Sequence, residues 1–166
     1  MESLEIISLF QAHKQTAARA EYLRERITFL SENIEDMRKT ALEDGIHITQ
    51  RLTGMPRSGQ TQNPVEALAV ALADGDDPPH IKAEVHNLRQ MQREYRELAF
   101  DVRTVEILLK GLKERERFVV EKTLIEGMTW NELEDCHEKH FGVFLTREGL
   151  RRARRVAIEK LCRIAV

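Results

Sequence analysis

This sequence contains few of the residues on which strands, disulfide frameworks and membrane spans depend. Aromatic residues make up only 5% of the 166 residues, and period-two runs of Val, Ile and Thr are absent, so strands have little from which to form. Two cysteines are too few for a disulfide framework in a chain of this length. No apolar stretch approaches the ~18 residues of a membrane span, and the first residues carry acids where an export signal carries bases. We therefore expect an all-α protein of the reducing cytoplasm with no membrane partner.

Signatures of catalysis and of cofactor binding are also missing. Phosphate-binding loops, dinucleotide-binding folds and nucleophile elbows are absent, and no spacing of Glu and His sets up a general acid–base pair. Cys136, His137 and His140 form a C-H-x-x-H segment that resembles part of a zinc site. A closed zinc site needs four ligands, and the other cysteine, Cys162, lies far along the chain. We expect no enzyme, cofactor or metal site here, but surface histidines and a buried thiol.

The net charge of −2 conceals an uneven distribution of charge along the chain. Residues 143–166 contain seven Arg or Lys residues against Glu148 and Glu159, which leaves this end at +5 and the first 142 residues at −7. A basic end on an acidic body is typical of a chain that presents one face to a polyanion.

Two long helices are predicted in the first two thirds of the chain. From Ile6 to Ala41 the apolar or small positions are three and four residues apart, which predicts one long helix ending before Gly45. A loop or flexible connector is expected over 43–63, followed by a short helix with Asn63 as its N-cap. A second long helix is predicted from about Pro79 to Leu109. A single apolar stripe cannot be buried alone, so we expect a helical hairpin or coiled coil, within one chain or shared between protomers of a homodimer or higher homo-oligomer.

Beyond this region the pattern changes to three short helices with turns between them. The first spans about 112–127 and ends at Gly127. The second has Thr129 as its N-cap and Glu132 three residues later, a capping box, and ends at Gly142. The third has Thr146 as its N-cap and an apolar stripe at Leu150, Ala153, Ala157 and Leu161. We therefore divide the chain into a partner or dimerisation region, 1–109, and a three-helix domain, 110–166.

The last of these helices, 146–162, carries the residues with the clearest chemistry. Five arginines in nine residues lie off the core stripe, and guanidinium groups bind phosphates or take guanine bidentately. The first turn of such a helix meets base edges, so Arg147, Glu148 and Arg151 are expected to read bases, while the later arginines hold phosphates. The predicted DNA-binding residues are Thr146, Arg147, Glu148, Arg151, Arg152, Arg154 and Arg155.

The last 55 or so residues resemble region four of the sigma-70 family. The matching features are the Arg-Glu-Arg run at 115–117, the segment Gly127-Met128-Thr129-Trp130-Asn131-Glu132-Leu133, and Thr146, Ala157 and Leu161 in the last helix. The interval from Leu133 to Thr146 is longer than in that pattern. With the coiled N-terminal half, the chain is similar to small phage transcription regulators of the ArpU and RinA kind. The resemblance implies a helix-turn-helix that inserts its last helix into the major groove of double-stranded DNA, with RNA polymerase as a further partner.

Three functions remain open from the sequence. A sequence-specific transcription regulator of phage or prophage origin is preferred to an initiation factor, because nothing upstream resembles the sigma segment that melts the promoter. A small-terminase-like packaging protein joins the same kind of DNA-binding unit to oligomerising helices. An interaction or scaffold protein would use the arginines on an acidic partner. Trp130 is expected to be a core anchor rather than a platform on which bases stack.

Overall fold

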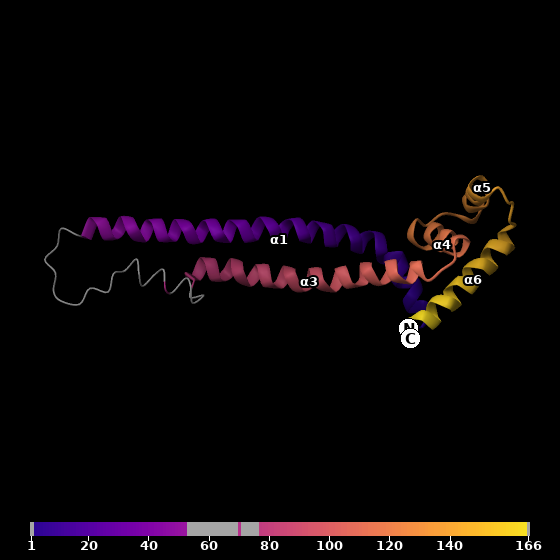
Figure 1. Ribbon diagram of the computed structural model, residues 1–166, viewed down its shortest axis with the longest axis horizontal. Helices are drawn as coiled ribbons and strands as arrows, with labels where there is room; N and C mark the ends of the chain where they lie inside the picture. Colours follow the sequence, from indigo (N-terminus) through magenta and orange to yellow (C-terminus); the bar gives the residue numbers. More distant parts are fainter. Residues whose placement is uncertain (1, 53–69, 71–76, 166) are drawn as a thin grey trace. The chain divides into compact units, whose positions relative to one another are not determined.

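The computed structural model describes residues 2–52, 70 and 77–165, and every regular element in these ranges is helical (Figure 1). The elements are α1 (Ser3–Leu52), α3 (Pro79–Lys110), α4 (Glu114–Val120), a π-helical turn η1 (Glu121–Ile125), α5 (Trp130–Phe141) and α6 (Arg147–Ile164). No strand occurs among the described residues. The predicted all-α fold is therefore confirmed.

Helix α1 is longer than the sequence indicated. The helix was predicted to end before Gly45, but it continues through this residue to Leu52, so the predicted connector over 43–63 was wrong for its first ten residues. Glycine inside a helix costs only about 1 kcal/mol relative to alanine, and residues 46–52 contain no proline to stop the next turns. The rest of the predicted connector, and nearly all of the short helix expected after Asn63, lie outside the described residues.

The chain forms two compact units, which we describe separately. One comprises Met1–Glu21 together with Arg96–Val166, and the other comprises Tyr22–Tyr95. In the second unit, Leu30 and Ile34 of α1 are buried against Ile81 of α3. Arg38 donates two hydrogen bonds to the buried carboxylate of Asp77, at 2.9 and 2.7 Å. The buried apolar residues Leu30, Ile34 and Ile81 all belong to the predicted apolar stripes.

The core of the first unit includes the start of α1 and the end of α3. Ile6 and Phe10 of α1 are fully buried in one cluster with Val105 of α3 and Leu161 of α6. The start of α1 therefore lies beside the end of α6, as Figure 1 shows. Three short helices bury little apolar surface by themselves. The long helices contribute the remaining side chains that this core needs.

The local signals in the last third are confirmed in atomic detail. Thr129 is the N-cap of α5, and its backbone N–H and hydroxyl donate to the Glu132 carboxylate at 2.9 and 2.8 Å, which lowers the pKa of Glu132. Gly142 ends α5 in the left-handed conformation with φ of 64°, the usual role of glycine there. Thr146 is the N-cap of α6, where its hydroxyl accepts from the backbone N–H of Gly149. Between α4 and α5, Gly127 has φ of 70°.

Candidate nucleic-acid interface

Helix α6 rests on α4 and α5 through a small apolar cluster. Leu150 of α6, Leu133 of α5 and Val119 of α4 are each almost fully buried and pack together. Further along α6, Ala157 and Leu161 are fully buried in the neighbouring core. The predicted stripe is therefore the buried face of α6. Its remaining faces are left for polar side chains.

The second anchor of α6 is an ion pair to α4. Lys160 donates a hydrogen bond to the carboxylate of Glu116, which is largely buried. Burial alone would raise the pKa of Glu116, but the hydrogen bonds from Lys160 and from the backbone of Lys113 outweigh it, so the pKa lies below its usual value. Opposite charge and hydrogen bonding favour the ionised form. Lys160 is therefore a structural cation that joins α6 to α4.

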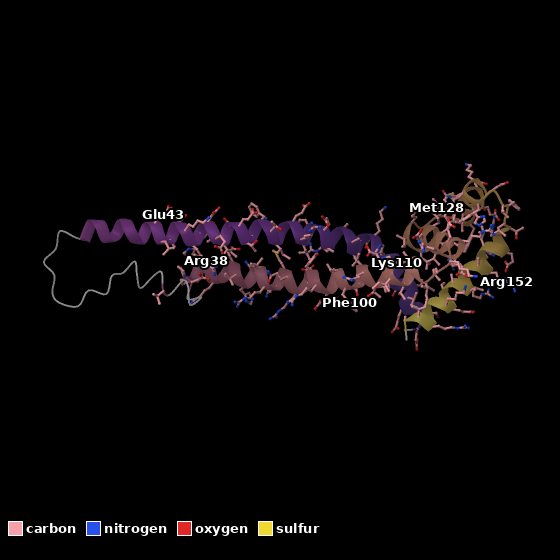
Figure 2. All side chains as sticks on the ribbon, in the orientation of Figure 1. Arg38, Glu43, Phe100, Lys110, Met128 and Arg152 are labelled. Carbon is pink, nitrogen blue, oxygen red and sulfur yellow. The ribbon has the colours of Figure 1, made fainter. Side chains whose placement is uncertain are left out.

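The arginines of α6 lie away from its buried stripe. Arg147, Arg151, Arg152 and Arg155 are exposed, and Arg154 is half-buried; Arg152 is labelled in Figure 2. Thr146 and Glu148 are exposed as well, so all seven predicted DNA-binding residues have solvent access along the first three turns of α6. The structure brings these residues together on one exposed part of the helix.

Two side chains of α5 hold arginines of α6 in place. The guanidinium of Arg147 donates a hydrogen bond to Oδ1 of Asn131. The guanidinium carbons of Arg154 and Arg151 lie 4.8 and 5.6 Å from the centre of the Trp130 ring. Cations over an indole face are attracted to its π electrons. The first turn of α5 therefore orders three of the five arginines.

The other charged side chains on this part of α6 differ in whether they have a partner within the protein. Glu148 lies 3.8 Å from Arg151, an exposed pair one turn apart, and such pairs contribute little to stability. Arg152 and Arg155 have no hydrogen bond, ion pair or ring contact to any residue that the structure describes. Their guanidinium groups are thus available for an external anion without the loss of an internal partner.

The turn between α5 and α6 is fixed by a buried histidine. His137 was predicted to lie on the surface, but it is fully buried, and its Nδ1 lies 3.0 Å from the carbonyl oxygen of Val143. Its ring contacts Phe141, with 4.8 Å between ring centres. His137 follows the buried Leu133 by four residues, so both lie on the buried face of α5. Phe144, at the tip of the same turn, is 60% exposed.

The other two residues of the C-H-x-x-H segment, Cys136 and His140, have different surroundings from His137. His140 is exposed and stacks on Phe118 with 4.9 Å between ring centres, and Cys136 is half-buried. Among the residues with described positions, no three His, Cys, Asp or Glu side chains are arranged to hold a metal ion.

Trp130 and Asn131 are the two site residues that the sequence analysis did not identify. Trp130 packs against the cluster of Leu133 and Leu150, as a core anchor would, but it is only half-buried and its ring also carries two arginines. Asn131 follows it on the exposed first turn of α5. Both belong to α5, whereas the arginines belong to α6, so only the packing of the two helices brings these side chains together.

No protein-family model matches this chain, and neither a curated protein nor a solved structure matches it. Within the part of the chain that the structure describes, no helix is both long enough and apolar enough to cross a membrane.

Proposed function

We propose that this chain is a sequence-specific transcription regulator that binds double-stranded DNA and inserts α6 into the major groove. The observation that carries the proposal is the exposed arginine surface on the first three turns of α6, on a helix whose opposite stripe is buried against α4 and α5. The N-caps Thr129 of α5 and Thr146 of α6 support the proposal, because they lie where the resemblance to region four of the sigma-70 family expects caps. A phage or prophage origin and RNA polymerase as a further partner are part of the same proposal.

Each residue at this surface has a role that follows from its position. The first turn of a recognition helix meets base edges, so Arg147, Glu148 and Arg151 read the sequence. Arginine binds guanine bidentately and glutamate accepts from cytosine. Asn131 holds Arg147 from the side, which limits the directions in which that guanidinium can point.

The later arginines hold the DNA backbone. Arg152, Arg154 and Arg155 follow the base-reading turn and neutralise phosphates, which positions the helix without selecting a sequence. Three phosphate contacts per helix release counterions with a slope of log affinity against log salt of about −2.7, and two helices of a homodimer would give about −5. In such a dimer the two half-sites lie about 34 Å apart.

The test is selection of bound sequences from a pool of random duplex DNA at two salt concentrations. We expect one enriched motif with two half-sites, and loss of enrichment in the double variant Arg147→Ala, Arg151→Ala. The matched control is Arg103→Ala with Lys110→Ala, which removes the same charge from exposed positions of α3. This control variant should select the same motif as the unchanged protein.

Two other results would point to the other candidate functions. DNA binding by a ring of many copies, measured by analytical ultracentrifugation, would favour a packaging protein of the small-terminase kind. Absence of both enrichment and salt-dependent binding would overturn the DNA proposal and leave an acidic protein as the partner of the arginines.

A further inference from the structure

A hollow of about 480 Å³ lies beside the arginine surface of α6. It is bordered by Ile7 of α1, by Trp130 of α5, and by Arg151, Arg154, Arg155 and Ile158 of α6. These residues all belong to the first compact unit. Small-molecule sites in proteins commonly occupy about 300–1,000 Å³. The hollow is therefore large enough for a ligand of the size of one nucleotide.

Three of the side chains that border the hollow are cationic. Arg154 and Arg155 follow Arg151 by three and four residues on α6, and all three border the hollow. Because Arg155 has no partner among the described residues, its guanidinium can donate to an incoming anion without breaking an existing bond. The planar guanidinium fork matches the geometry of a phosphate or carboxylate group. An anion with several acceptor oxygens suits three such groups.

Three other side chains that border the hollow are apolar or aromatic. Ile7, Ile158 and the indole of Trp130 border it, and these side chains favour a flat, weakly polar ring. Glu159 also lines the hollow, one turn beyond Arg155. Its carboxylate repels a phosphate and accepts hydrogen bonds from hydroxyl or amino groups. A ligand is therefore oriented with its anionic group towards the arginines and its donors towards Glu159.

We propose that this hollow binds a nucleoside phosphate. The phosphate is held by the three arginines, two of which lie over the Trp130 ring. The base lies against Ile7 and Ile158, and ribose hydroxyls or a base amino group donate to Glu159. The ligand is either a free mononucleotide or the phosphorylated end of a nucleic-acid strand, since both present the same chemistry. This inference does not depend on duplex DNA recognition by α6.

Fluorescence of Trp130 provides the test, because it is the only tryptophan in the chain. The probes are adenosine 5′-monophosphate, adenosine, inorganic phosphate and a short 5′-phosphorylated single-stranded oligonucleotide, each also titrated by calorimetry. We expect saturable binding of the monophosphate, and at least about tenfold weaker binding of adenosine and of phosphate alone, since each lacks one half of the contacts. Saturable binding of the oligonucleotide but not of the mononucleotide would assign the site to strand ends.

Two variants locate the bound molecule. Arg155→Ala should weaken binding about tenfold or more, as expected for loss of a charge-assisted hydrogen bond. Arg152→Ala removes an equally exposed arginine that does not border the hollow, and its affinity should stay within about twofold of the unchanged protein. Equal binding by the Arg155→Ala variant, or no heat and no fluorescence change with any probe, would overturn the proposal. Since no duplex is present, these results are independent of the DNA selection.

Discussion

The contact between Trp130 and Arg154 predicts a measurable energetic coupling between α5 and α6. Arg154 is half-buried and its guanidinium carbon lies 4.8 Å from the centre of the indole ring. Cation–π contacts contribute about 0.5–1 kcal/mol at exposed sites and about 2 kcal/mol when they are desolvated. A half-buried contact lies between these limits, so we expect a coupling of about 1 kcal/mol.

A double-mutant cycle isolates this coupling from the other effects of each substitution. The variants are Trp130→Leu, Arg154→Ala and the combination of both, and the free energy of unfolding is measured in urea by far-ultraviolet circular dichroism. Trp130→Leu alone also weakens packing against Leu133 and Leu150. The cycle subtracts this loss because it occurs in both Trp130→Leu variants. The remaining difference reports the contact between the ring and the guanidinium.

A second cycle with Arg151 serves as the control. Its guanidinium carbon is farther from the ring centre, at 5.6 Å, and its side chain is 49% exposed, so water screens the contact and Glu148 competes for the charge. We expect a coupling of about 0.5 kcal/mol or less. A coupling of Trp130 to Arg154 below about 0.3 kcal/mol, within the usual error of additivity, would refute the argument that Trp130 orders this arginine.

Two further predictions concern the stability of each compact unit. Gly142→Ala places a side chain at φ of 64° in otherwise open space, so it should destabilise the first unit by about 1–2 kcal/mol; urea unfolding should show a smaller loss for Gly142→Asn, which tolerates this conformation. In the other unit, hydrogen bonds from Arg38, followed by its charge, outweigh burial and lower the pKa of Asp77. This pair should therefore stabilise the protein fully above about pH 4, and the contribution should be lost as pH falls through the lowered pKa. The difference in unfolding free energy between the unchanged protein and Asp77→Asn should shrink from pH 7 to pH 3, and a difference that grows would contradict the assignment.

Several features of the fold follow from short stretches of sequence, and these were predicted correctly. The capping box of Thr129 and Glu132 and the N-cap Thr146 involve groups three residues apart, so the local sequence contains every atom that makes the contact. The stripe of Leu150, Ala157 and Leu161 was also correct, because a helix repeats every 3.6 residues whatever surrounds it.

The errors arose where a local preference was weak or where a distant segment decided the outcome. Gly45 disfavours a helix by only about 1 kcal/mol, so it did not end α1. His137 is buried because it shares the face of α5 that Leu133 buries, and the next loop supplies a hydrogen-bond partner for it there, the carbonyl oxygen of Val143. Neither composition nor periodicity indicates such a pairing.

The amino-acid sequence alone indicates that this protein is helical and that its last helix is basic. It also indicates where most of the described helices begin and end. Helical period, capping and charge are properties of neighbouring residues, which explains this success. The packing of the helices, in contrast, brings Trp130 and Asn131 against the arginines and places Ile7 of α1 at the same hollow as Arg155. These contacts join segments far apart in the chain, and they depend on which apolar faces are buried together rather than on any local pattern.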